Sequence, residues 1–363
     1  MLKNDYQCKL NTLKNPFEIN VRNKNYETRL REFKLGSLRN VEPFAHRNII
    51  RMNSTYLELL DSWDDIRGRP TALFLPAFCI LTFGTILGLW GVYGTFQAKE
   101  YGLAIGFLIG SIILCLLNYS FFGMGGKTDL LGKTHYPIRL NRKSRTLYAF
   151  SPFRKKIIEM DWDALRFSEI GFHTGFEREI RASLVDEKGI VQEEIVLFRY
   201  RDYIKDVAEN KIAFLKLYMD ADDVQKVDDE ISEFFDIYNR KETVKETLER
   251  IYLAINIEEW ESNQRRNQKD LQIFFLEMIF AFPQFFLRRL GLLFSKIPVW
   301  PEHIEKECRV EADDLYDSMK IKRKLPPIQF TLFEIIVLVL GCIIMMSLAG
   351  TFFYGVAYWG LNR

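Results

Sequence analysis

The sequence predicts an α+β membrane protein with three transmembrane helices, a cytosolic antiparallel β-domain and a helical arm. Three observations support this fold class: long uncharged runs, short β-like segments between them, and a sharp separation of apolar and charged stretches along the 363 residues. Hydrophobic residues make up 48% of the chain and charged residues 27%, which excludes a disordered chain and a polytopic transporter. The near balance of 50 Lys+Arg and 48 Asp+Glu argues against a nucleic-acid partner.

Two apolar runs predict a transmembrane hairpin over residues 71–124. Residues 73–96 carry no charge and are long enough to cross about 30 Å of hydrocarbon. The polar link Gln97–Glu100 follows, and residues 101–123 are again uncharged, with Asn118 as their only strongly polar side chain. Two spans joined by so short a link must run antiparallel.

A third apolar run predicts a C-terminal span over residues 329–360, with a single charge, Glu334, near its start. Asn118 and Glu334 are candidate intramembrane polar contacts, because polar groups in apolar runs usually face protein or mark a function. The alternatives are an ordinary hydrogen bond between spans for Asn118 and an interfacial position for Glu334.

Basic residues near the ends of the spans predict the orientation of the chain. They are frequent in residues 1–70, after the second span and in Lys320–Lys324, whereas the link between the first two spans carries only Lys99. We therefore expect the N-terminal segment 1–70 and residues 124–328 in the cytosol, and the C-terminus on the other side.

Residues 273–294 are apolar enough to suggest a fourth span, but Glu277 and the pair Arg288-Arg289 interrupt them. A crossing here would also move Lys320–Lys324 out of the cytosol. We expect an amphipathic segment in the membrane interface, within a helical arm of residues 241–328. The same reading includes a helix buried against the other spans, and a soluble core helix is the alternative.

Six short segments with β-like composition predict an antiparallel meander, and a helix is expected to close it. From Asp222 onward the apolar residues recur every three or four positions, which places them on one helix face: Val224, Val227, Ile231, Phe234 and Tyr238. The predicted β-domain spans residues 134–240, and its strands are residues 137–141, 146–150, 156–160, 165–170, 180–185 and 192–198.

A meander closed by one amphipathic helix resembles the pleckstrin-homology-like (PH-like) fold, and residues 137–165 look like the opening of bacterial membrane-anchored versions. With the hairpin and the final span, the chain resembles an uncharacterised enterobacterial inner-membrane family encoded near type VI secretion effectors. The resemblance covers roughly residues 70–240 and the last span. It implies a bacterial inner-membrane protein with a periplasmic C-terminus, and such neighbours are often immunity proteins. No functional residue is carried over from it.

The sequence contains no motif that selects a catalytic, cofactor or metal site. The five Cys form no close pair and the four His are scattered, which excludes a disulfide framework and argues against zinc. Gly123–Thr128 lacks the first glycine of a phosphate-binding loop, because position 121 is Phe. Glu259 and Glu261 would point apart on a helix. We expect no enzyme and no cofactor.

Two charge clusters are the remaining candidates for binding sites. An acidic stretch over residues 220–236 suits a basic partner, or is a solvated helix face. A basic cluster at the first turns of the β-domain suits an anionic phospholipid surface, or reflects the ordinary excess of basic residues in the cytosol. The members of the basic cluster are Arg139, Arg142, Lys143, Arg145, Arg154, Lys155 and Lys156.

Together these patterns indicate a non-enzymatic membrane binding protein. The resemblance points to an immunity protein that neutralises a membrane-acting toxin of a contact-dependent (type VI) secretion system, with that secreted toxin as its partner. The alternative is a structural or lipid-sensing accessory subunit of a membrane assembly. A homo-oligomer is compatible with the same patterns.

Overall fold

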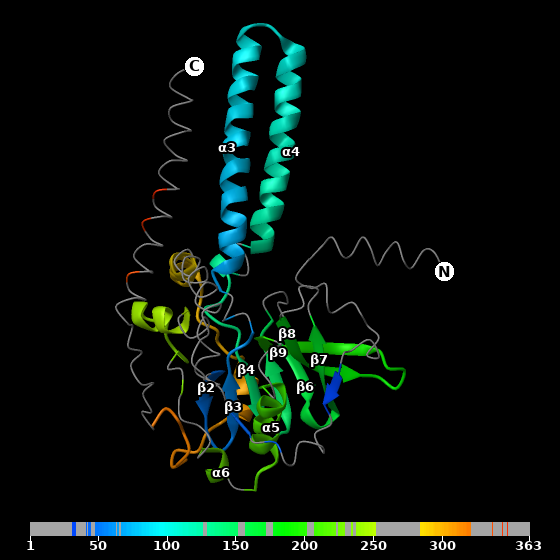
Figure 1. Cartoon of the computed structure of the whole chain (residues 1–363), viewed down its shortest axis with the longest axis vertical. Coiled ribbons are helices and arrows are strands. Elements are labelled where there is room, and N and C mark those ends of the chain that lie inside the picture. Colours follow the sequence, from blue (N-terminus) through cyan, green and yellow to red (C-terminus); the bar gives the residue numbers. More distant parts are fainter. Residues whose placement is uncertain are drawn as a thin grey trace. The chain divides into compact units, whose positions relative to one another are not determined.

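The computed structural model combines helices with antiparallel sheets in a mixed α+β fold (Figure 1). It divides into two compact units, called here the sheet unit and the hairpin unit. The sheet unit comprises Met1–Asp64, Lys133–Lys241 and Ile297–Pro326. The hairpin unit comprises Asp65–Gly132, Glu242–Lys296 and Pro327–Arg363. The structure describes residues 31–33, 41, 43–44, 48–62, 64, 67–125, 129–151, 157–171, 177–201, 207–222, 224–228, 234, 237–251, 284–320, 336, 343 and 347.

One antiparallel sheet of the sheet unit has five strands in chain order. A tight turn between the first two of them is held by Asn53, whose Oδ1 accepts the backbone N–H groups of Thr55 and Tyr56. The turn from Arg142 to Arg145 joins the third and fourth strands. The strands are β2 (Ile49–Met52), β3 (Tyr56–Leu59), β4 (Ile138–Asn141), β5 (Thr146–Ala149) and β6 (Ile158–Asp161).

The other antiparallel sheet has four strands. Its longest hairpin turns at Asp186–Gly189, where Asp186 Oδ1 accepts the N–H groups of Lys188 and Ile190, and Gly189 supplies the positive φ of 73°. In sheet order the strands are β1 (Arg31–Phe33), β7 (Leu165–Gly171), β8 (Glu177–Val185) and β9 (Val191–Arg201).

The six strands predicted from the sequence are present as β4 to β9, with small shifts at their ends. They do not form one meander: β6 and β7 lie in different sheets, and each sheet gains strands from the first 60 residues. The sequence prediction places no strand in residues 1–70, whereas the structure has β1, β2 and β3 there. The predicted domain of residues 134–240 is therefore incomplete, because β1, β2 and β3 of the two sheets lie before it in the chain.

The core of the sheet unit is closed by α5 (Val207–Asp220). Ile212, Leu215 and Tyr218 of this helix are fully buried and pack in the same cluster as strand residues of both sheets. Trp162 belongs to the same core and is 1% exposed. The helix that closes the core is therefore α5, which ends at Asp220, whereas the sequence predicts a closing helix that begins at Asp222. In the described part of the predicted helix there is the short α6 (Gln225–Asp228), with Val224 and Val227 buried in the core.

The hairpin unit contains two long apolar helices, α3 (Arg69–Gln97) and α4 (Tyr101–Gly125), which run side by side in opposite directions (Figure 1). Within them, Ala77–Gln97 and Tyr101–Ser120 are long and apolar enough to cross a membrane. Most of their large apolar side chains are exposed. Residues 244–251 and 284–294 are also helical. The predicted third span and residues 273–283 lie outside the described residues, apart from 336, 343 and 347, which are helical.

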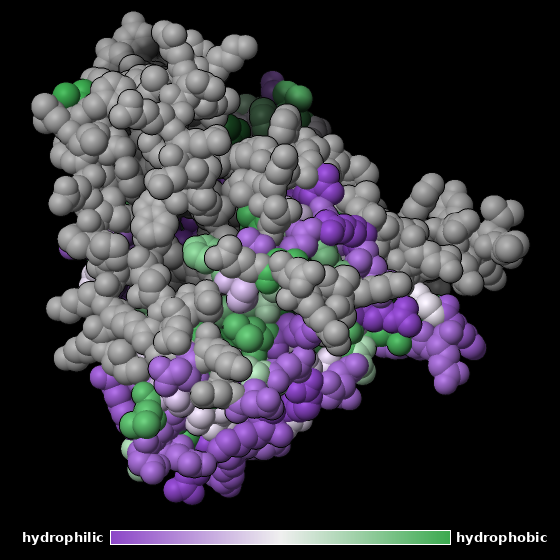
Figure 2. Space-filling view, turned by 60° about the horizontal axis from the view of Figure 1, so that its bottom comes forward, coloured by the Kyte–Doolittle hydropathy of each residue, from purple (hydrophilic) through white to green (hydrophobic). Residues whose placement is uncertain are grey.

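The two units differ in the character of their exposed side chains. Seen from the side of α5 and α6, the described surface is mainly hydrophilic (Figure 2). On α3 and α4 the exposed side chains are instead Leu, Ile, Phe and Trp, with Trp90 68% exposed.

Candidate functional site

The basic turn between β4 and β5 is tied to the C-terminal end of α5. Arg142 donates to the carbonyl of Ala221, and its guanidinium lies 5.6 Å from the ring centre of Tyr218. Arg145, at a positive φ of 52°, donates to the carbonyl of Met219 at 3.0 Å. Because the last carbonyls of a helix have no partner inside it, these two arginines satisfy the end of α5.

Carboxylates neutralise the rest of this turn. Arg145 forms ion pairs with Asp163 at 2.6 Å and with Asp220 at 2.9 Å. The bond from Arg145 holds the pKa of Asp163 below its ordinary value. Lys143 pairs with Glu311 at 3.0 Å. The predicted lipid-binding cluster is therefore compensated in its described part, and Asp220 of the acidic stretch belongs to the same network.

Arg139 does not belong to a surface cluster at all. Its side chain is 0% exposed, and its guanidinium lies 2.7 Å from Glu58 and 3.3 Å from Glu305. An anionic headgroup cannot reach it, which corrects the expectation for this residue. Arg154, Lys155 and Lys156 lie outside the described residues.

An aromatic cage surrounds the Arg139 guanidinium. Its carbon lies 4.2 Å from the ring centre of Tyr56 and 4.6 Å from that of Trp300, distances that favour cation–π attraction. The Trp300 indole N–H also donates to Glu58 at 3.1 Å. Burial raises the pKa of Glu58, against the opposing effects of the Arg139 charge and the bonds from Arg139 and Trp300. The bonds from Arg139 and Trp300 thus oppose the cost of burying the Glu58 carboxylate.

The cage is part of a seam that binds residues 297–320, called here the strap, to the five-stranded sheet. Arg51 donates two bonds to Asp317, and Ser54 donates its N–H and hydroxyl to Asp314. Tyr148 donates to Glu307, and desolvation together with this bond raises the pKa of Tyr148 to about 12. The strap includes α9 (Glu302–Glu307). It explains why every residue of β3 and β4 is buried, including the polar ones.

A second buried ionic network lies on β8 and β9. Arg181 binds Glu179 at 2.5 Å and Glu194 at 2.8 Å, and Arg199 binds the other oxygen of Glu179. Ser183 donates to Glu194 at 2.8 Å. Two arginines and two carboxylates balance in charge, as buried ionic groups require.

In the hairpin unit, Asp129 caps α3 from beyond the end of α4. Its carboxylate accepts the backbone N–H of Gly68 at 3.0 Å and the Thr71 hydroxyl at 2.6 Å, and Arg67 lies 3.6 Å away. No side chain of the helix's own N-cap residue does this, since that residue is Gly68. A carboxylate at a helix N-terminus is favoured by the free amides and the dipole. Asp129 thus closes the base of the hairpin.

Helix 284–294 packs against the same base. A Cβ on Gly68 would lie 2.6 Å from the carbonyl oxygen of Gln284, and one on Gly291 would lie 2.8 Å from that of Asp129. Glycine is therefore required at both positions for the backbones to approach. Arg69 donates to the Gln284 side chain at 3.0 Å and Arg67 to Ser295 at 3.2 Å.

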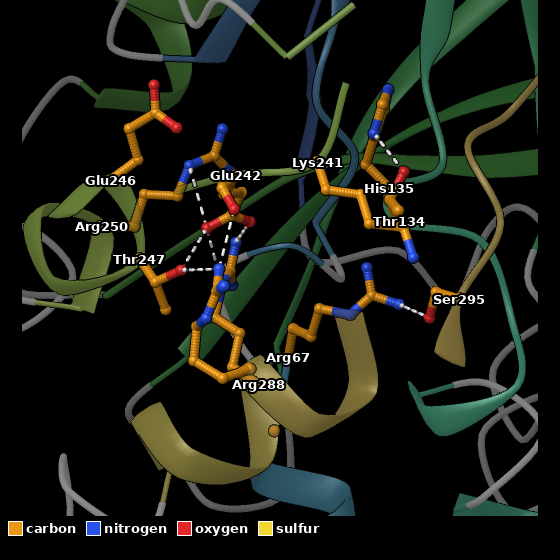
Figure 3. A network of polar contacts seen from close by, with 12 residues as sticks. Arg67, Thr134, His135, Lys241, Glu242, Glu246, Thr247, Arg250, Arg288 and Ser295 are labelled. Carbon is orange, nitrogen blue, oxygen red and sulfur yellow. Dashed lines mark hydrogen bonds and ion pairs between the residues drawn. The ribbon is translucent and has the colours of Figure 1, made fainter. Parts of the chain in front are cut away.

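Glu242 binds two arginines of this helix (Figure 3). Arg288, 1% exposed, binds Glu242 at 2.5 Å, and the Thr247 hydroxyl donates to the same carboxylate at 3.2 Å. Arg289 donates to the Glu242 backbone carbonyl at 2.7 Å. The charges of helix 284–294 therefore lie inside the hairpin unit, next to residues 242–251.

Asn118 forms the interhelical bond expected of it. Its Nδ2 donates to Thr82 Oγ1 at 2.6 Å, which links α4 to α3. Thr82, Ser111 and Ser120 donate to carbonyls of their own helices, four residues earlier. Glu334 lies outside the described residues.

The described residues contain no group of three His, Cys, Asp or Glu side chains that could hold a metal ion. The same residues contain several buried ion pairs that join segments far apart in the chain. Glu58, Trp300, Asp129 and Glu242 were missed by sequence reasoning, because each acts on a partner far along the chain. Their only local signal is a charged or indole side chain beside apolar residues, which many positions share.

Comparison with known protein families identifies the family of this chain. A model described as "Family of unknown function (DUF6708)" matches residues 114–312, which is more than half of the chain. No curated protein and no solved structure matches.

Proposed function

The chain belongs to DUF6708, a family of unknown function, and from that premise we propose that it is a non-enzymatic membrane protein whose task is to bind another protein. The observation that carries the proposal is the exposed apolar hairpin of α3 and α4. Two helices with segments of 21 and 20 residues that could each span a bilayer show large apolar side chains around most of their surface. In water such a surface would associate, whereas in hydrocarbon it is satisfied.

The polar groups of the hairpin support a bilayer environment. Threonine and serine hydroxyls return to backbone carbonyls of their own helix, so they expose no donor to the surroundings. Asn118 bonds across to Thr82 instead of facing outward. Inside a membrane a polar group without a partner costs several kcal/mol, and this pairing avoids that cost for the hydroxyl donors and for the Asn118 Nδ2.

In this proposal the C-terminal apolar run 329–360 forms a third span in a bacterial inner membrane. The basic flanks place residues 124–328 in the cytosol and the C-terminus in the periplasm. The two antiparallel sheets closed by α5 are compatible with the PH-like fold that the sequence resembles. On this reading the sheet unit is a cytosolic domain whose clusters of paired charges stabilise it.

For the partner, we propose a secreted toxin that acts on the membrane, with this chain as the immunity protein. This step rests on the family resemblance. A hairpin with two full spans exceeds what is needed to tether one small domain, which favours recognition within or next to the bilayer. A structural or lipid-sensing accessory subunit of a membrane assembly is the alternative, favoured by the large share of polar contacts that serve internal packing.

The topology is tested with reporter fusions in the full chain. A fusion after Lys306 should report the cytosol and a fusion after Arg363 the periplasm. A periplasmic signal after Lys306 would contradict the three-span arrangement. Cytosolic signals at both positions, together with release of the chain from washed membranes, would contradict a membrane protein.

The immunity role is tested by co-expression with the secreted effector encoded beside the gene, scoring survival. The full chain should protect, and a variant with α3 and α4 replaced by an unrelated transmembrane hairpin should protect less at equal membrane abundance. Full protection by the replaced hairpin would locate recognition in the cytosol. No protection by the native chain would favour the accessory role.

A further inference from the structure

Helix 284–294 buries Arg288 together with Leu287 and Leu292, yet leaves three other large apolar side chains exposed. Its exposed side chains are Phe286 at 57%, Leu293 at 68% and Phe294 at 57%. Residues 286 and 293 are seven positions apart, so they share one face of the helix. The opposite face holds Gln284, Arg288 and Gly291, all buried.

The buried face is firmly held, which fixes the direction in which the aromatic face points. Arg288 is bound by Glu242, Gln284 by Arg69, and Gly291 lies against the backbone of Asp129. A rotation of the helix that hid Phe286 would break the ion pair between Arg288 and Glu242, and the buried carboxylate would keep only the more distant Arg250, at 3.9 Å. That loss is strongly destabilising.

Helix 284–294 lies beside the residues at which α3 begins and beyond which α4 ends. Its first turn touches Gly68, the residue immediately before α3, and its last turn is joined through Ser295 to Arg67 and the carbonyl of Asp129. Asp129 follows α4. Helix 284–294 therefore lies at the end of the hairpin where α3 begins and α4 ends. With α3 and α4 in a bilayer, as proposed, this end is at the level of the membrane surface. Leu131, 57% exposed, adds a further apolar side chain beside this base.

We propose that helix 284–294 is a lipid-contacting helix that lies in the interface of the same membrane leaflet from which the hairpin emerges. Phe286, Leu293 and Phe294 enter the boundary between headgroups and acyl chains, while Arg288 stays inside the protein. This inference rests on the proposed membrane location of α3 and α4. It adds a second membrane contact, which holds the base of the hairpin at a fixed depth.

The test uses the full chain with the photoreactive amino acid benzoylphenylalanine at single positions. Phe286 and Phe294 are replaced in separate variants, because both are exposed and chemically similar to the probe. Leu116, 62% exposed on α4, is the positive control for the bilayer, and Lys188 in the β8–β9 turn is the control for water. The variants are reconstituted in vesicles of phosphatidylethanolamine and phosphatidylglycerol with a trace of alkyne-tagged phosphatidylcholine, and irradiated.

Probes at 286 and 294 should each attach the tagged lipid several-fold more than the probe at 188. Labelling at 116 with only background at 286 and 294 overturns this inference and leaves the proposed hairpin intact. Background labelling at all positions overturns both. A protein adduct at 286 or 294 in place of lipid would show that a second copy or another protein covers the helix, and would also overturn the inference.

Discussion

The sheet unit and the hairpin unit treat their apolar side chains in opposite ways. In the sheet unit, Leu140, Leu147 and Phe167 are fully buried, and the described residues on the face seen in Figure 2 are mainly hydrophilic. In the hairpin unit, leucine, isoleucine and aromatic side chains are exposed along α3, α4 and helix 284–294, while Arg67 and Arg288 are buried. The comparison teaches that one chain contains two units built for different surroundings.

Both units nevertheless bury an arginine beside a glutamate, but the two ion pairs hold different kinds of element in place. Arg139 and Glu58 attach the strap to the face of a sheet, so that polar strand residues become interior. Arg288 and Glu242 hold a helix by its charged side, so that its apolar side remains outside. The same type of contact therefore completes a buried core in one unit and orients exposed apolar side chains in the other.

The largest expected effect is in the sheet unit, at the caged pair. Arg139→Met leaves the Glu58 carboxylate buried without its cation, and should destabilise the unit by about 3–5 kcal/mol. Hydrogen exchange of β3 and β4 in the detergent-solubilised full chain measures this. The double variant E58Q/R139M removes the stranded charge and should recover a large part of the loss. An unchanged exchange rate in R139M would mean that the cage is not needed for stability.

The next effect is in the hairpin unit, where Gly68 has φ of 88° and touches the backbone of Gln284. Gly68→Ala should cost at least about 2 kcal/mol, because an L-residue is strained there and its Cβ collides with backbone. Thermal unfolding in detergent checks this.

The matched control for that variant is Gly106→Ala on α4, where an added Cβ meets nothing within 4 Å. It should be neutral or stabilising by up to about 1 kcal/mol, since alanine favours helix. Equal destabilisation by both variants would show that the base of the hairpin is not tightly packed.

A smaller effect is expected within the hairpin itself. Asn118→Leu removes the bond to Thr82 and should weaken the α3–α4 contact by about 0.6 kcal/mol, the average for such bonds in membranes. Unfolding in mixed micelles with rising dodecyl sulfate measures it. Ser120→Ala is the control, because that hydroxyl bonds only within its own helix. A loss well above 2 kcal/mol would indicate that Asn118 has a further partner.

The smallest effect concerns the exposed pair of Arg145 and Asp163. The pKa of Asp163 in the folded chain is lowered by Arg145, so the pair stabilises the fold above the ordinary pKa of 3.8. This contribution is lost as the pH falls through the lower, folded-state value. Arg145→Gln should return the pKa of Asp163 towards 3.8, as followed by NMR titration, and cost less than about 1 kcal/mol, because solvent screens an exposed pair. An unchanged titration would show that the pair does not form in solution.

The elements that sequence reasoning predicted are those with local signals. Strands β4 to β9 follow a two-residue alternation bounded by turn residues, and α3 and α4 follow from the length of uncharged runs. Helix α5 carried a usable signal that was overlooked: Ala208, Ile212, Leu215 and Met219 recur at helical spacing and all are buried. The prediction favoured residues after 222, where carboxylates at the start suggested a cap.

The candidate site was predicted less well. The basic cluster was identified by composition, but composition does not tell whether an arginine faces solvent, a carbonyl or a carboxylate. Arg139 and Arg142 lie within three residues of each other, yet one is in the core and the other caps a helix. The pattern of residues 273–294 predicts an amphipathic helix, and Arg288 argues against a span there. The sequence does not show that Arg288 is buried, because its partner Glu242 lies 46 positions earlier in the chain.

By itself the sequence determined which segments can leave water and which form strands, because hydrophobic length and alternation are properties of neighbouring residues. Only the tertiary structure decided the environment of each charge. Asp129 caps a helix that begins 60 positions earlier in the chain, and Glu58 is paired with Arg139 and covered by Trp300. Whether a charge is tolerated depends on desolvation and on partners brought together in space, and neither is encoded in the residues next to it.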